Sequence, residues 1–183
     1  GVLVQQKEKC RTGHFWVLVA PLRHVLFEYT PQHDGDAVDD VLAGYKGYLV
    51  ADAHAVYDHL YTSGDLREVN CWAHCRRYFF KAMTSDPKRA TTALDLIGML
   101  FRIERTHATS PRKKKESIRK KRSNPIVDSF LSWCDAEAPL VPDETPISDG
   151  IRYARNQRVG LSSFIEDGRL PLHNNWSELE LRR

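Results

Sequence analysis

The feature that most constrains the fold is a pair of strand-like runs, each followed directly by a helical pattern. The first run, "YLVA" at 48–51, has the continuous apolar character of a buried strand, and "HAVYDHLY" after it has the spacing of an amphipathic helix. The second run, "REVNCWAH" at 67–74, is predicted to be a strand, and "CRRYFFKAM" begins the next helix. Because strands that alternate with helices form parallel sheets, the sequence predicts an α/β core with a partly parallel sheet.

The residues on either side of this alternation differ from it in character. Residues 13–30 hold two runs rich in Val, Phe, Trp and Tyr separated by "APLR", which predicts a β-hairpin or meander, and a short helix is expected within 37–45. From 86 to 156 the spacing is helical, with a long amphipathic helix, a basic run and a helix with a proline near its start. We expect an N-terminal part of the core at 1–85, a helical insertion at 86–156 and a C-terminal part of the core at 157–183.

Composition limits the class of protein but does not identify a binding partner. The chain has 183 residues and a formal net charge of +3, so its overall charge permits a nucleic acid partner but does not demand one. Its four cysteines have no regular disulfide spacing, which favours a reducing compartment. We see neither a signal peptide nor the roughly 20 consecutive apolar residues of a membrane-spanning helix. We expect a soluble intracellular protein, and the strand-like run that begins at Gly1 indicates a fragment of a longer one.

Two carboxylates stand where they could carry chemistry. Asp52 follows "YLVA" without an intervening turn, and the carboxyl ends of strands are where open α/β sheets bind their ligands. An Asp that caps the next helix is the more ordinary interpretation of this position. Glu178 stands in "HNNWSELELRR", where Asn174 or Asn175 can cap a helix and Glu178 can complete a capping box. Both acids therefore have a structural explanation as well as a chemical one.

If the fold brings Asp52 and Glu178 together, the pair can hold a hard cation such as Mg²⁺. Magnesium usually binds one or two protein carboxylates and completes its octahedron with water and phosphate oxygens. Two such ions about 4 Å apart can promote an in-line displacement at phosphorus. This chemistry normally uses a third carboxylate. The acidic residues before Asp52 lie in a turn, on a strand without supporting pattern, or on a polar loop and helix face, so the first acid is not visible.

Three ordered pieces of the chain resemble the catalytic core of the IS66-type insertion-sequence transposases, which belong to the DDE group. The pieces are "GYLVADAHAVY" at 47–57, "CWAHCRRYF" at 71–79 and "DGRLPLHNNWSE" at 167–178. The resemblance covers nearly the whole chain, from Phe15 to the end. It implies an RNase H-like (DDE) mixed sheet flanked by helices, with an α-helical insertion between the second and third catalytic acids.

The resemblance implies a catalytic triad of Asp, Asp and Glu that binds Mg²⁺, with Mn²⁺ as an alternative ion. Asp52 matches the second acid and Glu178 the third, so both are expected to be catalytic and to bind metal. The first Asp of the family precedes the segment that aligns with "VLVQQ", so the triad is expected to be incomplete in the chain as given. The implied activity is strand cleavage and strand transfer at the terminal inverted repeats of an insertion sequence. The residues expected near the site are His74, Asn174 and Asn175.

The resemblance also sets the expected partners and the alternatives. The partners are the DNA ends of the element, its target DNA, further copies of the chain in a homo-oligomer and accessory proteins of the same element, in the bacterial cytoplasm at the nucleoid. Two departures from the family pattern are His173 in place of an Asp and Leu179 in place of an Arg. The loss of this Arg, together with the missing first Asp, leaves open a catalytically inactive remnant that only binds DNA. An RNase H-like nuclease without strand transfer is the other alternative.

Positive charge is concentrated in two places. The run at 112–122 has eight Lys or Arg in eleven residues, and its ordinary interpretation is a helix face that touches only solvent. In a transposase such a run is expected to neutralise DNA phosphates, which makes binding strongly salt dependent. Two further arginines open the helix after "CWAH". The residues predicted to contact DNA are Arg76, Arg77, Arg112, Lys113, Lys114, Lys115, Arg119, Lys120, Lys121 and Arg122.

Cys71, His74 and Cys75 are residue types that bind zinc. Structural zinc usually takes four ligands in two spaced pairs, and no second pair follows at a fitting distance. We therefore expect Cys71 and Trp72 to be strand and core residues. Core packing is also expected for Trp16, Trp133, Phe79 and Phe80.

Overall fold

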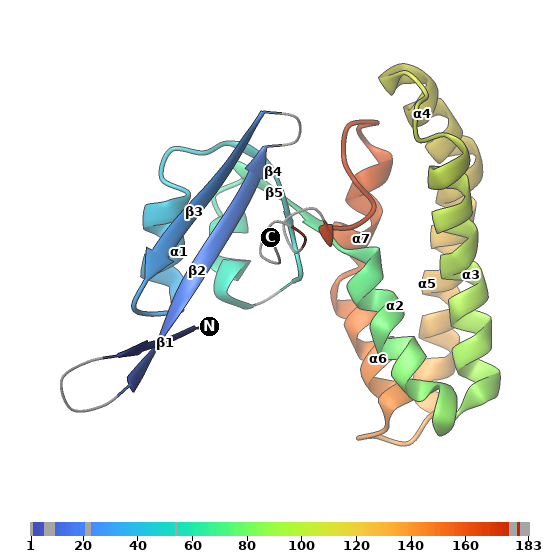
Figure 1. Ribbon diagram of the computed structural model, residues 1–183. Helices are drawn as coiled ribbons and strands as arrows, with labels where there is room; N and C mark the ends of the chain where they lie inside the picture. Colours follow the sequence, from blue (N-terminus) through green and yellow to red (C-terminus); the bar gives the residue numbers. More distant parts are fainter. Residues whose placement is uncertain (1, 6–9, 21–22, 54, 176–178, 180–183) are drawn as a thin grey trace. The chain divides into compact units, whose positions relative to one another are not determined.

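The computed structural model describes residues 2–5, 10–20, 23–53, 55–175 and 179 (Figure 1). Among these residues, three strands come first, two further strands alternate with short helices, and the remainder is mostly helical. The protein is therefore a mixed α/β structure, as the sequence predicted. By their internal contacts the residues fall into two units. The first unit consists of Gly1–Gly47, His54–Arg67 and Asn174–Arg183, and the second consists of Tyr48–Ala53 and Glu68–His173.

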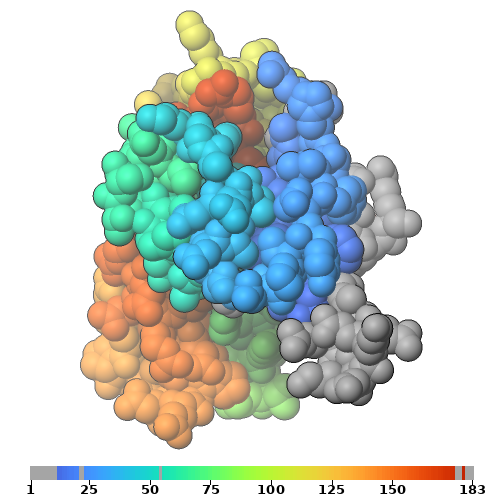
Figure 2. All heavy atoms as spheres, turned by 90° about the vertical axis from the view of Figure 1, so that its left-hand side faces the viewer, coloured from blue at the N-terminus to red at the C-terminus, as the bar shows by residue number. Residues whose placement is uncertain are grey.

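The first unit contains a three-stranded antiparallel sheet in the order β1-β2-β3. Its strands are β1 (Val2–Gln5), β2 (Cys10–Ala20) and β3 (His24–Thr30). In the β2–β3 ladder, Phe15 lies opposite Tyr29, with ring centroids 5.4 Å apart. The β-hairpin predicted within residues 13–30 is confirmed. The side chains of β3 are largely exposed, and Figure 2 shows this part of the chain, in blue, at the surface that faces the viewer.

Trp16 of β2 packs in the core of the first unit, as predicted. Its indole N–H donates to Thr30 Oγ1 at 2.7 Å, and its ring lies flat against the imidazole of His33, with centroids 4.8 Å apart. A polar partner for the indole N–H lets this large ring stay buried without an unsatisfied donor. The hairpin is thereby tied to the segment that leads into the first helix.

α1 (Gly35–Val41) follows the hairpin. The helix begins where the Asp34 side chain accepts the N–H of Ala37 at 3.1 Å, and it buries Val38 against the rest of the unit. The short helix predicted within 37–45 is confirmed, with a start two residues earlier than expected.

The segment Ala55–Tyr61 is a 3₁₀-helix with no buried side chain, where the sequence predicted an amphipathic α-helix. The end of this segment is held by a hydroxyl, since Thr62 Oγ1 donates to the carbonyl of His59 at 2.7 Å. A short segment without a buried face gains little stability from packing as an α-helix. It therefore adopts the tighter 3₁₀-helix instead.

A second sheet pairs β4 (Gly47–Ala51) with β5 (Leu66–Asn70). The N–H of Gly47 donates to the carbonyl of Asp65 at 2.9 Å, so the two strands begin side by side and run in the same direction. The alternation of strand and helix patterns therefore does produce a parallel pair. The single mixed sheet that the sequence predicted is not confirmed. Among the described residues the strands form one antiparallel sheet of three and one parallel sheet of two.

Helices make up most of the second unit. They are α2 (Trp72–Lys81), α3 (Pro87–Thr106), α4 (Arg112–Ile118), α5 (Asn124–Glu137), α6 (Pro146–Asn156) and α7 (Arg158–Ser162). α2 packs against α3 and α6, and α5 packs against the same two helices, so the four form a bundle (Figure 1). Trp72 and Phe130 are fully buried there, with ring centroids 5.3 Å apart. In the described part of the chain, no helix combines the length and the apolar character that crossing a bilayer requires.

α3 illustrates how the sequence determines where a helix begins and which of its faces is buried. Asp86 accepts the N–H of Arg89 at 3.1 Å, and Pro87 occupies the first turn, where a missing N–H costs nothing. Residues that recur every three or four positions share one buried face, which packs in the bundle. These residues are Ala90, Ala93, Ile97 and Leu100. The long amphipathic helix predicted here is confirmed.

The predicted boundaries after residues 85 and 156 do not coincide with the division between the two units. α2 was expected in the core and α3 in the insertion, yet the two helices pack on each other within the second unit. The three-part division concerns where helices are inserted relative to the catalytic acids, and it stays a prediction.

Candidate active site

Asp52 directly follows β4 and has an exposed side chain. Because β4 and β5 are parallel, their carboxyl ends meet at one edge of the sheet, where Asp52 follows one strand and Cys71 follows the other. The next residue, Ala53, has a φ of +62°, a left-handed conformation that residues with a Cβ seldom adopt. Such strained positions are frequent at functional sites. The predicted position of Asp52, at the end of a strand, is confirmed.

Asn70, the last residue of β5, ties this edge to the helices that follow later in the chain. Its Nδ2 donates to Oε1 of Gln157 at 2.8 Å, at the junction between α6 and α7, and its side chain is buried. A Cβ on Gly160 would lie only 2.7 Å from Cγ of Asn70. The absence of a side chain at position 160 therefore lets α7 approach the end of β5 closely.

A cavity of about 350 Å³ lies beside Gln157, between residues of α2 and α6. It is lined by Tyr78, Asp149, Arg152, Tyr153, Asn156 and Gln157. The rings of Tyr78 and Tyr153 stack there with centroids 4.7 Å apart. Burial raises the pKa of Tyr153, and smaller contributions come from nearby groups that include Asp52. Burial therefore favours the neutral phenol form of Tyr153.

The segment that precedes Asn174 is anchored at the start of α2. The backbone N–H of Trp72 donates to the carbonyl of Leu172 at 3.0 Å, and its indole N–H donates to the carbonyl of Leu161 at 2.8 Å. Trp72 comes two residues after the end of β5. Leu172 is therefore held at the edge of the parallel sheet where Asp52 also lies.

His74, Arg76 and Arg77 belong to the first two turns of α2. His74 is partly buried, and both arginines are exposed. The guanidinium of Arg76 lies 5.9 Å from the ring centroid of Phe80. The core packing predicted for Phe80 is wrong, because this side chain is 60% exposed on the outer face of α2. An exposed arginine over an aromatic ring keeps its charge available to an anion. The role of His74 near the site and the DNA contacts of the two arginines stay predictions.

Glu178 lies outside the described residues, so its pairing with Asp52 stays a prediction. Asn174 and Asn175 are partly buried and belong to the first unit, whereas Asp52 belongs to the second. Their expected roles at the start of a helix and near the metal site also stay predictions.

The two departures from the family pattern have different surroundings. The imidazole of His173 stacks on the ring of Phe101 of α3, with centroids 6.0 Å apart and planes 9° apart. Leu179, by contrast, is 55% exposed. His173 therefore packs on α3, whereas more than half of Leu179 is exposed.

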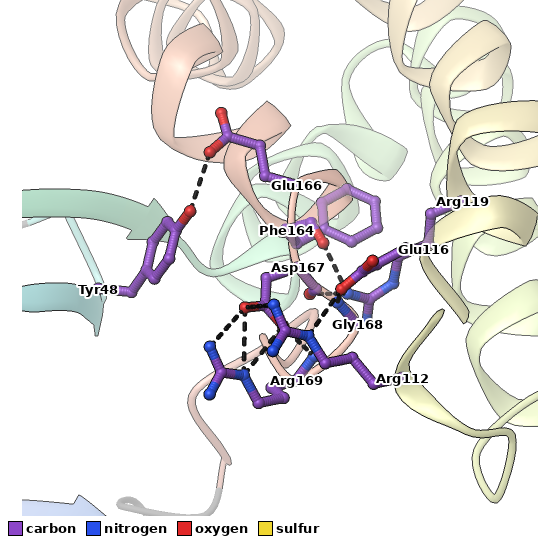
Figure 3. Close-up of polar contacts among 9 residues, drawn as sticks. All are labelled: Tyr48, Arg112, Glu116, Arg119, Phe164, Glu166, Asp167, Gly168 and Arg169. Atoms are coloured by element: carbon purple, nitrogen blue, oxygen red, sulfur yellow. Dashed lines mark hydrogen bonds and ion pairs between the residues drawn. The ribbon is translucent and has the colours of Figure 1, made fainter. Parts of the chain in front are cut away.

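The motif "DGRLP" forms a loop held by charged groups (Figure 3). Asp167 is 4% exposed and accepts the backbone N–H of Arg169 at 2.8 Å and its guanidinium at 2.7 Å. Arg112 of α4 pairs with the same carboxylate at 2.9 Å. The hydrogen bonds of Arg169, with the charge of Arg112, hold the pKa of Asp167 below its usual range. The acid of this motif is therefore engaged in holding the loop.

The prediction that Arg119 contacts DNA is wrong, because this side chain has no exposed surface. Its Nη1 donates to the carbonyls of Phe164 and Asp167 at 2.6 and 2.7 Å, and its Nη2 donates to the carbonyl of Leu170 at 2.8 Å. The remaining two N–H groups bind the carboxylate of Glu104, both at 2.7 Å. All five donors of the guanidinium are used, so none is left for a phosphate.

The other basic residues at 112–122 differ in their exposure and in whether they pair with a carboxylate. Arg112 is half exposed but pairs with Glu116 and Asp167, and Lys115 is mostly buried beside Glu104, at 3.4 Å. Arg122 lies 3.5 Å from the imidazole of His107. The run is helical throughout, and its exposed lysines suit a solvated face or a DNA contact equally. These exposed lysines are Lys113, Lys114, Lys120 and Lys121.

The thiols of Cys71, Cys75 and Cys134 are fully buried. Burial raises the pKa of Cys75 well above its ordinary value and that of Cys134 to about 12, so both stay protonated. Cys71 and Trp72 are core residues, as expected, but β5 ends at Asn70 and Trp72 begins α2. Among the described residues, no three His, Cys, Asp or Glu side chains gather as a metal site.

Sequence reasoning missed the cluster formed by Glu104, Arg119 and Asp167. Arg119 was hidden in a run of like charges, and its partners lie 15 residues earlier and 45 to 51 residues later. One signal was available: "DGRLP" is a motif with a charged pair, and a loop of that kind needs donors for its carbonyls. Nothing in the local pattern assigns Arg119 to that task.

The fold and the site define an α/β protein whose parallel strands end at an exposed carboxylate and whose second unit carries a basic helical surface. The family model for the transposase IS66 family matches residues 1–183. The chain therefore belongs to the IS66 family of transposases.

Two relatives are themselves described as uncharacterized proteins of Sinorhizobium fredii. Protein y4hP is 25% identical over 204 residues, which covers 98% of this chain and 37% of y4hP. Protein y4qI is 28% identical over 167 residues, which covers 86% of this chain and 31% of y4qI. The chain thus spans about a third of the length of these relatives. No solved structure matches it.

Proposed function

We propose that the chain is the RNase H-like catalytic domain of a DDE-type transposase, which cleaves DNA at the terminal inverted repeats of an insertion sequence and joins the ends to a target. The observation that carries this proposal is the exposed Asp52 at the carboxyl end of the parallel pair β4 and β5, next to the strained Ala53. Membership of the IS66 family supplies the expected reaction.

Asp52 suits a hard cation, because its carboxylate is exposed and the nearby thiols are buried and protonated. Asp52 and Glu178 would hold Mg²⁺, or Mn²⁺ in its place. When bound, the ion would supply the charge that activates a water or a 3′-hydroxyl and stabilises the leaving oxygen.

The exposed cations of the second unit would bind the DNA backbone. Arg76 and Arg77 stand on α2, which begins at the same sheet edge as Asp52, and the exposed lysines of the basic run stand on α4 and the turn after it. Phosphate contacts of this kind fix the register of DNA without reading its sequence. Further copies of the chain and accessory proteins of the same element would complete the active complex.

A catalytically inactive remnant that only binds DNA is the second candidate, and one observation favours it. Leu179 is an exposed apolar side chain where the family usually has Arg, so position 179 lacks the charge that this Arg would carry. A nuclease without strand transfer is the remaining alternative. All three candidates share the basic surface, and they differ in whether strands are cut and whether the cut ends are joined.

Cleavage and joining assays on labelled DNA ends, with Mg²⁺ or Mn²⁺, separate these candidates. The transposase cuts and joins, the nuclease only cuts, and the remnant does neither while still binding DNA. Asp52→Asn and Glu178→Gln should each abolish cleavage while DNA affinity is retained. Asp95→Asn is the matched control, because it removes an exposed carboxylate from α3, a helix outside the proposed site. Cleavage that survives Asp52→Asn would refute the metal assignment.

A further inference from the structure

The "DGRLP" loop holds two exposed guanidinium groups over one buried carboxylate (Figure 3). Arg169 donates from Nε and Nη2 to the carboxylate of Asp167, with Nη2 2.7 Å from Oδ2. Nη2 of Arg112, at the start of α4, lies 2.9 Å from the same oxygen. The side chain of Asp167 is 6% exposed, whereas those of Arg112 and Arg169 are 52% and 68% exposed. The carboxylate is therefore covered, and the two cations form the surface.

Both guanidinium groups keep N–H donors that this cluster does not use. A guanidinium has five N–H groups. Arg169 binds Asp167 through Nε and Nη2, and Arg112 binds Glu116 through Nε and Asp167 through Nη2. Within the described part of the chain, Nη1 of neither arginine has an acceptor. The two N–H groups on each Nη1 are therefore available to an anion at the surface.

The backbone fixes the positions of the two cations. Gly168 has no Cβ, and a Cβ there would overlap the carbonyl oxygen of Arg112. The N–H of Gly168 donates to Oε1 of Glu116 at 3.2 Å, and Nε of Arg112 donates to the same oxygen at 2.8 Å. The loop and the first turn of α4 are therefore packed on each other. Cations that are already held in place lose little conformational freedom when they bind an anion.

The charges of this cluster lie at different depths. The two arginines and the carboxylates of Asp167 and Glu116 sum to zero, but the Glu116 side chain is only 22% exposed and that of Asp167 is nearly buried. Lys113 and Lys114 are exposed on the same turn of α4 and add positive charge. The two guanidinium groups also share one oxygen of Asp167, so they repel each other. A further anion on their outer side would relieve this repulsion.

The loop contacts the strand that leads to Asp52, and both belong to the second unit. The hydroxyl of Tyr48 on β4 donates to Oε2 of Glu166 at 3.1 Å, and Figure 3 shows this carboxylate turned away from the two arginines. Asp52 is the fourth residue after Tyr48, which is about 13 Å in extended chain. The phosphates of one DNA strand advance about 3.4 Å each along the duplex axis. A duplex bound at Asp52 can therefore reach the loop within a few base pairs.

We propose that Arg112 and Arg169 form a binding site for one phosphate of the DNA backbone, with Asp167 as the group that positions both. This inference rests on the proposed function for its DNA ligand. Nη1 of each arginine would donate to the free oxygens of the same phosphodiester. Such a contact holds the DNA in register at Asp52 and reads no base. Arg169 lies outside the basic run at 112–122, so cations from two distant parts of the chain meet here.

A methylphosphonate series tests the site in the whole protein. Labelled duplexes of an element end each carry one uncharged methylphosphonate, at successive positions, and fluorescence anisotropy gives their Kd. The proteins compared are wild type, Arg169→Gln and the double variant with Arg112→Gln and Arg169→Gln. At one position, a few base pairs from the cleavage point, the methylphosphonate should weaken wild-type binding about fivefold and leave the double variant unaffected.

The unmodified duplex gives a second measurement. The double variant should bind it about fivefold more weakly than wild type, whatever its base sequence. The slope of log K against log salt should fall by about 0.9, which corresponds to one phosphate contact. A fall of about 1.8 would mean that the two arginines bind separate phosphates, and it would overturn the shared site.

Arg89→Gln is the matched control. Like Arg112, Arg89 bridges two carboxylates, those of Asp86 and Glu137, at 2.9 and 2.6 Å. It lies at the start of α3, next to the end of α2 that is farther from the sheet. Its slope and its methylphosphonate pattern should match those of wild type, and an equal loss in this control would refute the site. If urea unfolding shows that the double variant does not fold, the exposed Arg169→Gln carries the test.

The outcomes separate this inference from the proposed function. The phosphate site is refuted if no methylphosphonate position distinguishes wild type from the folded variants. If Asp52→Asn abolishes cleavage while the double variant binds every duplex like wild type, only the phosphate site fails. If wild type shows the position that depends on the two arginines but cuts no strand, the catalytic function fails and the phosphate site remains.

Discussion

Arg119 and Glu104 are joined by two parallel hydrogen bonds, Nε to Oε1 and Nη2 to Oε2, both of 2.7 Å. Arg119 has no exposed surface and the Glu104 side chain is 14% exposed, so the pair is largely removed from water. A charge in such a place is stable only while its partner is present, since the desolvation cost of each ion is large. The pair makes the folded state depend on a contact between α3 and the turn after α4.

Arg119→Met should lower the free energy of unfolding by about 3–5 kcal/mol, because the Glu104 carboxylate loses both guanidinium bonds and keeps only Lys115 at 3.4 Å, and three carbonyls lose the guanidinium as a donor. Urea unfolding at neutral pH, followed by circular dichroism, measures the loss. Arg122→Met is the control: Arg122 is exposed in the same turn, and its replacement should change stability by less than about 0.5 kcal/mol. Equal effects of the two variants would contradict a stabilising role for the buried Arg119 side chain.

The same pair predicts a pH dependence of stability. Burial would raise the pKa of Glu104, but its bonds with Arg119 and then Lys115 outweigh burial and lower it. The folded pKa therefore lies below the unfolded one, so the contribution is complete above the ordinary Glu pKa of about 4.3 and is lost as pH falls through the folded value. The stability difference between wild type and Glu104→Gln should be constant from neutral pH to about pH 5 and shrink below it. A difference that grows on acidification would contradict this assignment.

Sequence patterns with a clear period were sufficient for much of the fold. Alternating β-formers around "APLR" predicted the β2–β3 hairpin, and regular apolar spacing with Asp86 and Pro87 at the start predicted α3. Patterns without a buried face were less informative, as the 3₁₀-helix at Ala55–Tyr61 shows. Whether strands join into one sheet depends on contacts between distant residues, and no local period encodes them.

In the candidate site, too, some residues could be placed from the sequence and others could not. Asp52 could be placed at a strand end because the run before it is continuous and apolar. Arg119 could not be placed, because its neighbours in the chain are exposed cations and its partners are a carboxylate and three backbone carbonyls elsewhere. Backbone carbonyls have no sequence signature, so a buried arginine of this type is recognised only once the loop it binds is seen.

The close approach of Gly160 to Asn70 predicts a strong coupling between these positions. Gly160→Ala should destabilise the protein by about 1–3 kcal/mol, because the new Cβ would lie 2.7 Å from Cγ of Asn70. In Asn70→Ala the obstructing amide is absent, so the same change at 160 should cost much less. A double-mutant cycle by urea unfolding measures this difference, and additive effects would show that the two residues do not meet.

Buried thiols should resist modification in the folded state. Cys71, Cys75 and Cys134 have no exposed surface, and burial raises the pKa of Cys134 to about 12. Thiolates are the reactive form, so in a Cys10→Ser background none of the three should react with an aromatic disulfide reagent near pH 8. All three should react after unfolding in guanidinium. Rapid modification of the native variant would show that this core opens readily.

Salt dependence distinguishes a DNA-binding surface from a solvated helix face. Lys113, Lys114, Lys120 and Lys121 are exposed, and each lysine that neutralises a phosphate of duplex DNA contributes about 0.9 to the slope of log K against log salt. Replacing all four with Gln should therefore reduce the slope by up to about 3.6, measured by fluorescence anisotropy with a labelled duplex. Arg119→Met should leave the slope unchanged, because Arg119 has no exposed surface with which to contact a phosphate. An unchanged slope in the fourfold variant would mean that these lysines face only solvent, and the DNA contacts would then have to come from elsewhere, with Arg76 and Arg77 of α2 the next pair to replace.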